Sequence, residues 1–380
     1  MLFSLEALQA RHGDSLLLHF GTPESPRLVV IDGGPSGVFP ALRKRLDALR
    51  AKRTTDGAPL PIRLLMVSHI DDDHIRGVLD LTDHLLKERS DRRPTSYEVT
   101  TLWHNAFEDV LGGVVAASTA SVAEVEGASA GEVLASLEVG PEAELVLAGV
   151  PQGRRLRDNA RALDWALNKP FDGLVEGPGD GNPVKLGGGL TLTVVGPGKE
   201  RIEALRKEWE KTVAKAPKEK LKAEAAAYVD RSVANLSSIV VLAEAGGKRM
   251  LLTGDARGDF VLEGLEAAGL LDGEGRIHVD LLKVPHHGSA HNVEEDFFRR
   301  VTADHYVISA DGKHDNPDVE MLQMLSTARA GARYTVHLTN SVPAADAFLT
   351  PDSARQGYQV VRRADGRDSV VVDLLDPLRD

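Results

Sequence analysis

The segment from residue 68 to 77 constrains this 380-residue chain more than any other, because it crowds like charges directly after an apolar strand. It reads Ser-His-Ile-Asp-Asp-Asp-His-Ile-Arg-Gly. Such crowding is costly unless a cation neutralises it. In an extended loop alternate residues face the same way, so His69, Asp71 and Asp73 are expected to point together. His74, entering a helix, can turn toward the same cavity, and the segment therefore predicts a metal site.

Part of this acidic run has a structural alternative. Carboxylates just before a helix also cap its N-terminus and favour its dipole, so Asp72 or Asp73 can serve in that way. The histidines have candidate partners further along the chain, where Asp255 and the pair His286 and His287 each follow an apolar strand. The chain contains no cysteine, so any metal must be held by histidine and carboxylate ligands.

Short apolar runs separated by turn-forming residues predict a series of strands. These runs are 2–8, 15–20, 27–32, 62–67, 190–195, 238–243, 249–253, 279–284, 305–309 and 334–338. Helical spacing of apolar residues predicts helices over 38–52, from about 74 to 86, and over 317–328. Strands that alternate with helices in two blocks indicate two β-sheets with helices on their outer faces, within a single domain over 1–380.

The two blocks are separated by residues 107–232, which are rich in alanine, glutamate, glycine and lysine and poor in aromatic residues. We interpret this region as a mainly helical insertion that contains the strand at 190–195. The stretch 199–222 is dense in charges of both signs, which is typical of a solvated helical face, and a nucleic-acid-binding arm is the alternative. Residues 341–380 are expected to form a C-terminal extension with strands.

The order of these motifs resembles the metallo-β-lactamase superfamily, which is marked by HxHxDH after a strand. Here the motif reads His69-x-Asp71-x-Asp73-His74, with aspartate in place of the second histidine. That variant is similar to the hydrolase domain of DNA-uptake competence proteins and their free-standing relatives. Three further matches carry the resemblance: Gly13-Asp14-Ser15 followed by Asp32-Gly33-Gly34, Leu252-Thr253-Gly254-Asp255, and Lys283-Val284-Pro285-His286-His287-Gly288-Ser289.

The similarity covers roughly residues 2–106 and 234–340. It implies an α/β fold, the αββα metallo-β-lactamase sandwich of two mixed β-sheets with helices on the outer faces. It also implies a site for two divalent ions. The implied ligands are His69 and Asp71 for the first ion, Asp73, His74 and either His286 or His287 for the second, and Asp255 as the bridge.

Family members usually supply a further histidine to the first metal, between the HxHxDH segment and the bridging aspartate. His84 and His104 are the candidates in that interval. His104 at a strand end is the better placed, with a histidine that merely packs or hydrogen-bonds as the alternative, whereas His84 falls within a helix. A carboxylate at Asp71 makes the ligand set harder, so we expect two Zn²⁺ ions, with Mn²⁺ or Fe²⁺ as alternatives.

Further polar residues are candidates for chemistry or substrate binding. Asp73 is expected to act in catalysis as well as in metal binding. His314 lies in the loop where the uptake-type domains carry another histidine, and it could protonate a leaving group or bind phosphate, with an exposed loop histidine as the alternative. Ser289, Asn235 and Ser237 are substrate contacts by resemblance, and helix capping also explains Ser289.

The resemblance favours a metal-dependent hydrolase, with phosphodiester hydrolysis of DNA or a nucleotide as the leading function, because paired metal ions suit attack on phosphorus. The net charge of −12 excludes a globally basic nucleic-acid-binding surface, although arginines at 154, 155, 157 and 161 form a local basic patch. One alternative is hydrolysis of a carbon ester, lactone or β-lactam on the same metal centre. Another is a non-enzymatic scaffold that binds a protein partner through the insertion.

The sequence shows no sign of a membrane segment. No run approaches the roughly 18 to 20 apolar residues that span a bilayer. The first twenty residues lack the basic start and unbroken apolar stretch of a signal peptide. We therefore expect a cytoplasmic protein without a membrane partner.

Overall fold

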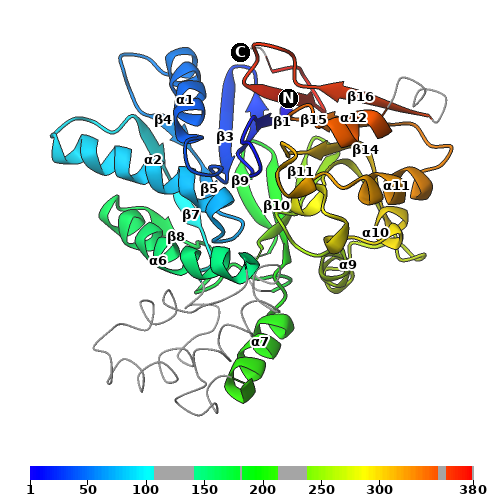
Figure 1. Cartoon of the computed structure of the whole chain (residues 1–380). Helices are drawn as coiled ribbons and strands as arrows, with labels where there is room; N and C mark the ends of the chain where they lie inside the picture. The colour runs from blue at the N-terminus through cyan, green and yellow to red at the C-terminus, as the bar shows by residue number, and fades with distance from the viewer. Residues whose placement is uncertain (107–140, 180–181, 213–237, 350–356, 379–380) are drawn as a thin grey trace.

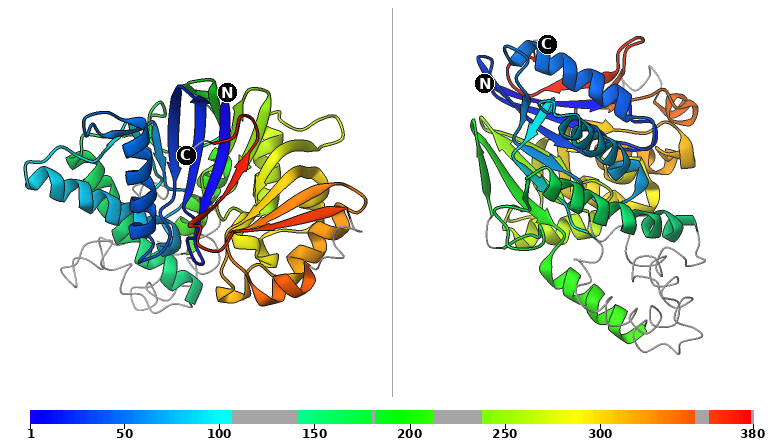
Figure 2. Two further views of the ribbon diagram at one scale, coloured as in Figure 1. Left: turned by 90° about the horizontal axis from the view of Figure 1, so that it is seen from above. Right: turned by 90° about the vertical axis from the view of Figure 1, so that its left-hand side faces the viewer.

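Two large β-sheets face each other, and helices cover their outer faces (Figures 1 and 2). The computed structural model describes residues 1–106, 141–179, 182–212, 238–349 and 357–378. This arrangement confirms the predicted αββα sandwich of two mixed sheets. No helix in those ranges combines the length and the apolar character needed to cross a membrane.

The first sheet is built mainly from the N-terminal part of the chain. Its strand order is β17 (Ser369–Asp373), β1 (Leu2–Leu8), β2 (Leu16–Thr22), β3 (Ser25–Ile31), β5 (Leu64–Met66), β7 (Thr101–Trp103) and β8 (Ala166–Leu167). Neighbours from β17 to β3 are antiparallel, and those from β3 to β8 are parallel. The helices against its outer side are α1 (Phe39–Arg53), α2 (Asp72–Ser90) and α6 (Pro141–Ala162). Two short strands, β4 (Leu60–Ile62) and β6 (Tyr97–Val99), pair separately.

The second sheet is built mainly from the C-terminal part. Its order is β16 (Tyr358–Arg362), β15 (Tyr334–Leu338), β14 (Val301–Ile308), β13 (Ile277–Lys283), β12 (Lys248–Leu252), β11 (Val240–Ala245), β10 (Leu190–Gly196) and β9 (Val184–Gly187). The strands from β16 to β12 are parallel, and the remaining pairs are antiparallel. The helices associated with it are α9 (Gly258–Ala267), α10 (Glu295–Arg300), α11 (Val319–Ala328) and α12 (Pro343–Phe348). Helix α7 (Lys199–Thr212) projects from the body of the molecule (Figure 1).

Apolar side chains bury the interfaces between these layers. Large residues such as Phe3, Phe20 and Trp103 are fully buried between the two sheets. On α1, Leu42, Leu46 and Leu49 recur every three to four residues, so they form one stripe that is buried against the first sheet. The alternation of apolar and polar residues thus fixes which face of each element points inward.

The predicted elements are found with shifted ends. The apolar run 62–67 is divided between β4 and β5, because exposed Arg63 separates the two strands. Helix α2 begins at Asp72, two residues before the expected start, because Asp71 has an extended backbone and takes the N-cap position. The hairpin predicted over 238–253 is confirmed as β11 and β12.

The predicted insertion and C-terminal extension both contribute strands to the sandwich. Of residues 107–232, the described parts supply α6, β8, β9, β10 and α7, and β10 pairs with β11 inside the second sheet. Residues 107–140, 180–181 and 213–232 lie outside the described part. In the C-terminal extension, β16 joins the second sheet and β17 pairs with β1. The boundaries of the insertion and the extension stay a prediction.

Several loops meet at one edge where the carboxyl ends of parallel strands lie. The loop after β5 carries residues 67–71, and the neighbouring strands β12, β13 and β14 are followed by three further loops. The loop between β1 and β2 lies against the first of these, since the amide of Asp14 donates to the carbonyl of Asp73 at 3.3 Å. Polar residues that are distant in sequence are therefore gathered at this edge.

Candidate metal centre

The loop after β5 is held in place by the buried carboxylate of Asp32. Its Oδ1 accepts the amide of Ser68 at 2.7 Å, and its Oδ2 accepts the Ser68 hydroxyl at 2.7 Å. The same Oδ2 lies 2.9 Å from Nδ1 of His74, at the start of α2. Because Nδ1 is engaged, Nε2 of His74 is the nitrogen available to a ligand. Asp72 points elsewhere, since its Oδ1 accepts a hydrogen bond from Gln152 of α6 at 3.0 Å.

Four side chains have the spacing of a metal's ligand shell, two from the start of α2 and one each from the segments after β12 and β13. Nε2 of His74 lies 3.2 Å from Nε2 of His287 and 3.3 Å from Oδ1 of Asp255. Nε2 of His287 lies 3.4 Å from Oδ2 of Asp73 and 3.4 Å from Oδ2 of Asp255. Ligand atoms bound tetrahedrally to zinc at their usual bond lengths are about 3.3 to 3.6 Å apart. One divalent ion therefore fits among these four side chains.

His69 and Asp71 form a second group that also contacts Asp255. Nε2 of His69 is 3.4 Å from Oδ2 of Asp71 and 3.8 Å from Oδ2 of Asp255. Within the described residues, Nε2 of His69 and Oδ1 of Asp71 are buried and have no hydrogen-bond partner, and the same holds for Oδ1 of Asp255, which faces His74. Buried polar atoms are rarely left unsatisfied, because the loss of water is costly. Their donor chemistry fits a divalent cation.

Each of the four histidines is oriented through its Nδ1 atom. The Nδ1 partners are Asp32 for His74 at 2.9 Å, the Ser309 carbonyl for His287 at 2.8 Å, Ser68 Oγ for His69 at 3.1 Å and Asn292 Oδ1 for His286 at 2.7 Å. A metal-binding histidine commonly donates its other ring nitrogen to such an acceptor, which fixes the tautomer and the ring plane. All four rings thus present Nε2 toward Asp255.

Without an ion, protons balance the clustered charges. Burial alone lowers the pKa of His74, but the carboxylates of Asp255, Asp73 and Asp32 outweigh it and raise that pKa well above its ordinary value. Burial is likewise outweighed at His287, where Asp255 and Asp14 raise the pKa to about 10. Ligand histidines bind metals in their neutral form, so a bound ion would displace these protons and keep the charge balanced.

The geometry favours His287 over His286 as the ligand that pairs with Asp73. Both residues adopt left-handed backbone conformations, with φ of 46° and 55°. His287 is buried and lies in the close group with Asp73 and His74. Nε2 of His286 lies 3.6 Å from Oδ2 of Asp255, and its side chain is 33% exposed. His286 therefore lies at the open side of the cluster.

A buried ion pair beneath the centre was not assigned from the sequence. Nζ of Lys283 lies 2.7 Å from Oδ2 of Asp14, and both side chains are inaccessible to solvent. Oδ1 of Asp14 is 3.6 Å from Nδ1 of His287. Desolvating two charges is expensive, so such a pair is costly to keep. A lysine at the end of the apolar strand β13 was the signal that could have revealed it.

His104 and His84 have other partners. Nε2 of His104 contacts the carbonyl of Gly153 in α6 at 3.2 Å, and burial lowers the pKa of this imidazole to about 4. His104 belongs to none of the close groups of ligand atoms found in the described residues. His84 lies on α2 with Nε2 3.4 Å from Oε1 of Glu88. The structure thus does not bring either residue into the cluster.

The candidate substrate contacts are placed at different depths. His314 is exposed, and its ring centroid is 6.3 Å from that of His12. Ser289 is buried, and its Oγ accepts the amide of His291 at 3.4 Å, which is the capping alternative. Asn235 and Ser237 lie outside the described residues.

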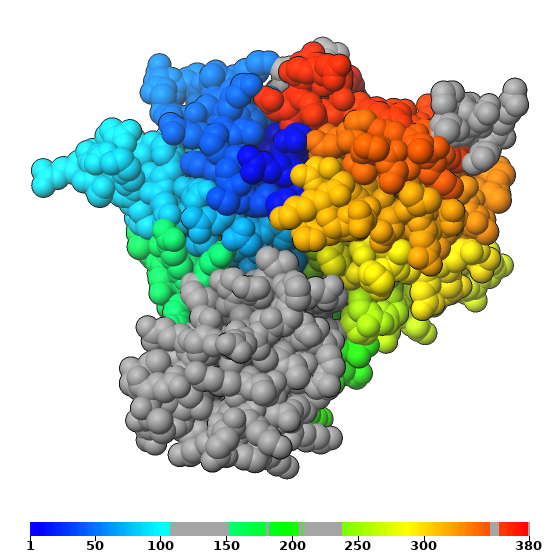
Figure 3. All heavy atoms as spheres, viewed as in Figure 1, coloured from blue at the N-terminus to red at the C-terminus, as the bar shows by residue number. Residues whose placement is uncertain are grey.

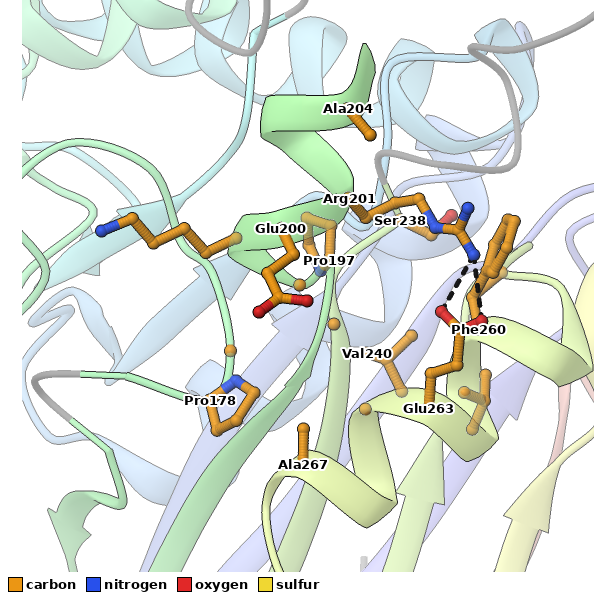
Figure 4. Close-up of a pocket in the computed structure, with 17 residues that line it drawn as sticks. Pro178, Pro197, Glu200, Arg201, Ala204, Ser238, Val240, Phe260, Glu263 and Ala267 are labelled. Carbon is orange, nitrogen blue, oxygen red and sulfur yellow. Dashed lines mark hydrogen bonds and ion pairs between the residues drawn. The ribbon is translucent and has the colours of Figure 1, made fainter. Parts of the chain in front are cut away.

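A cavity of about 540 Å³ adjoins the metal loops between the start of α7 and the helix α9 (Figure 4). Ser238 and Ala256 line it, and Ser238 Oγ accepts the amide of Asp255 at 3.3 Å. Arg201 in the cavity wall is paired within the protein, because it donates to both oxygens of Glu263 at 2.9 and 3.1 Å and lies over the ring of Phe260. The cavity offers space near the centre but no further cluster of ligand atoms among the described residues.

No protein-family model matches the chain, and no curated protein matches it. Among solved structures, the chain is similar to Zn²⁺-bound PqqB from Methylobacterium extorquens, with a TM-score of 0.39 and 16% sequence identity. The similarity covers 95% of this chain and 87% of that chain. A likeness at this level assigns neither a family nor a substrate.

Proposed function

We propose that this chain is a metal-dependent hydrolase that cleaves phosphodiesters. The observation that carries the proposal is the close group of His74, Asp73, His287 and Asp255, whose facing atoms lie mostly 3.2 to 3.4 Å apart. Without an ion these carboxylates are balanced only by protonated histidines, whereas a divalent cation would be bound by the same atoms with the histidines neutral. A non-enzymatic scaffold would not require this arrangement of ligand atoms.

The proposed roles at the centre follow from which side chains are buried and which are exposed. Two divalent ions, when bound, would supply an activated water near neutral pH and positive charge for the developing oxyanion. Asp255 lies between the two groups of ligand atoms and would bridge them. The side chains of Asp71 and Asp73 are 16% and 22% exposed, whereas His69 and His74 are buried. Substrate would therefore enter from the side of the two aspartates and His286.

An exposed imidazole lies near His12, whose ring is close enough to Asp73 and His287 to interact with them electrostatically. His314 lies in the loop after β14, and its backbone is left-handed with φ of 58°. We infer that the imidazole of His314 donates the proton that a leaving-group oxygen needs. No serine or threonine nucleophile is needed in this scheme.

The surface charges favour a nucleotide-sized substrate over long duplex DNA. The whole chain carries a net charge of −12. In the arginine patch on α6, Arg155 pairs with Asp83, and Arg161 lies 3.5 Å from Asp158. Paired arginines have less charge to offer to a phosphate backbone, whose binding depends on free cations.

A screen of metals against substrates tests the proposal. The protein is stripped with a chelator, reloaded with Zn²⁺, Mn²⁺ or Fe²⁺, and given bis-p-nitrophenyl phosphate, a cyclic dinucleotide, single-stranded DNA, a lactone and a chromogenic β-lactam. We expect metal-dependent cleavage of at least one phosphodiester, faster than of the lactone or lactam. The double variant Asp73→Ala/His74→Ala is the inactive control, with circular dichroism to verify its fold.

Two other outcomes of this screen would overturn the proposal. Faster turnover of the lactone or the lactam would replace the phosphodiester proposal with carbon-ester hydrolysis on the same centre. Failure to retain any ion after reloading would instead favour the non-enzymatic scaffold.

A further inference from the structure

We propose that His12 and Lys313 form an anion-binding subsite at the mouth of the metal centre, which takes a phosphate oxygen of the substrate. The inference rests on the proposed function, because it names the groups that would recognise an anionic substrate at that same site. Neither residue belongs to the ligand set. The two lie 301 positions apart in the chain and meet only in the folded protein.

The loop that carries His12 is built directly onto the segment of the metal ligands. A Cβ atom added to Gly13 would lie 1.9 Å from the carbonyl oxygen of Asp73, so only glycine allows this approach. The amide of Asp14 donates to the same carbonyl at 3.3 Å. His12 is thereby held close to Asp73 and His287, both of which interact electrostatically with its ring.

The loop that carries Lys313 is built onto the other ligand segment. The amide of Asp318 donates to the carbonyl of Gly288 at 3.0 Å, and a Cβ atom on Gly288 would meet Pro317 at 2.7 Å. The carbonyl of Ser309 contacts Nδ1 of His287, and the hydroxyl of Ser309 donates to the carbonyl of Gly13 at 2.7 Å. Ser309 thus joins both loops to the metal centre. Figure 3 shows the blue N-terminal segment adjoining the gold and orange surface of the C-terminal half.

The two side chains meet where these loops converge. Nζ of Lys313 lies 3.2 Å from Nε2 of His12. The Lys313 ammonium has only hydrogens to offer, so Nε2 of His12 accepts and its Nδ1 carries a proton. The ring of His314 lies 6.3 Å from the ring of His12, nearly perpendicular to it. Three nitrogen-bearing side chains thus line one side of the mouth.

Lys313 has no ion-pair partner in the described part of the chain, where no carboxylate lies within 4.0 Å of its Nζ. The carboxylates of Asp73 and Asp311 act on the neighbouring ring of His12, so acidic groups are near but do not pair with the ammonium. The backbone amide of Lys313 donates to Oδ1 of Asp311 at 3.0 Å, which shapes the loop and leaves the ammonium free of an acidic partner. An unpaired cation beside a metal centre attracts an anionic substrate.

The backbone of this loop is held in an unfavourable conformation. Gly312, His314 and Asp315 have φ of 88°, 58° and 63°. Residues other than glycine are disfavoured in this left-handed region, and such residues concentrate at functional sites. His286 and His287, in the loop of candidate ligands, also have left-handed backbone conformations. The fold thus maintains a costly loop conformation that presents Lys313 and His314 together.

Binding of inorganic phosphate tests the subsite without any need for turnover. Zn²⁺-loaded protein is titrated with phosphate in a calorimeter. We expect Lys313→Gln and His12→Ala each to weaken phosphate binding by about 10-fold, and Lys313→Arg to retain it, because a cationic donor is kept. The matched control is Lys87→Gln, which also removes a lysine charge and should bind as the wild type does. Lys87 lies near the far end of α2, about 21 Å along the helix from Asp73.

The outcomes separate the subsite from the proposed function. If Lys313→Gln and His12→Ala bind phosphate as tightly as the wild type, or if they lose zinc by elemental analysis, the subsite is wrong even when phosphodiesters are cleaved. A wild-type protein that binds no phosphate also overturns the subsite. If phosphate binding depends on both residues but no phosphodiester is hydrolysed, the subsite stands and the proposed function fails.

Discussion

Two buried clusters in this protein combine a carboxylate with histidine, and they are satisfied in opposite ways. In the first sheet, Oε2 of Glu6 contacts Nε2 of His19 at 3.0 Å, Oε1 accepts the hydroxyl of Ser369 at 2.7 Å, and Arg45 donates to both oxygens. At the metal centre, the contacts of Asp255 with the surrounding histidines run from 3.3 to 3.8 Å. We call the first cluster closed, because hydrogen bonds within the protein satisfy both oxygens of Glu6. We call the second cluster open, because the contacts of Asp255 are longer than most hydrogen bonds.

The difference shows what separates a structural histidine from a ligand histidine. His19 uses both ring nitrogens within the protein, since its Nδ1 lies 3.0 Å from Nη2 of Arg53. His74 and His287 engage only Nδ1 in hydrogen bonds to oxygen acceptors and direct Nε2 into the shared space. The hydrogen bonds of such an open cluster do not offset the cost of removing its polar atoms from water, and a bound ion would offset it.

The largest expected effect comes from removing the bridge between the two groups of ligand atoms. We predict that Asp255→Asn loses nearly all bound zinc and more than 100-fold of any metal-dependent activity. This is a larger loss than is usual for residues that only hydrogen-bond to the ligands. Its fold should survive, because the amide has nearly the same shape. Elemental analysis measures the zinc content, and circular dichroism measures the fold. Asp259→Asn, on the exposed start of α9, is the charge-matched control, and equal zinc content in both variants would contradict the comparison.

Much of the fold was predictable because it depends on local patterns. The alternation of apolar runs with turns predicted β1, β2, β3 and the β11–β12 hairpin, and helical spacing predicted α1. Long-range pairing was not predictable. Strand β17 lies beside β1 although more than 360 residues separate Leu5 from its partner Val372, and no local pattern encodes that register.

The same division holds at the metal centre. His69, Asp71, Asp73 and His74 could be predicted because they lie together after one strand. The pairing of Asp14 with Lys283, and of His12 with Lys313, depends on loops from distant parts of the chain. His104 was a plausible ligand by position, but its orientation toward Gly153 is decided by the packing of α6, which the sequence pattern does not reveal.

A smaller effect, and one on stability rather than on metal content, is expected at the closed cluster. Burial alone raises the pKa of Glu6, but the hydrogen bond and charge of His19 and the charge of Arg45 outweigh it and lower the pKa from 4.5 to about 2. A depressed carboxyl pKa contributes stability above pH 4.5 that is lost as the pH falls toward 2. We predict that Glu6→Gln lowers the free energy of unfolding by about 3 kcal/mol at pH 7.

Denaturant titrations at pH 7, 4.5 and 3 measure this dependence. The gap between Glu6→Gln and the wild type should narrow as the pH falls, while zinc content stays unchanged. Glu98→Gln, at an exposed position of β6, is the control and should cost little at any pH. A gap that is constant with pH would show that Glu6 acts through packing rather than through its charge.

The smallest effect is expected at His104, which tests whether the open cluster extends further. Because its Nε2 is engaged by the Gly153 carbonyl and burial keeps the ring neutral, His104→Gln should retain the full zinc content and lose about 1 kcal/mol of stability with the hydrogen bond. His69→Gln, which removes a predicted ligand of the first ion, should lose zinc under the same conditions. Loss of one equivalent of zinc from His104→Gln would mean that this imidazole leaves the Gly153 carbonyl and turns toward the metal when an ion binds. His104 would then be a metal ligand rather than a structural histidine.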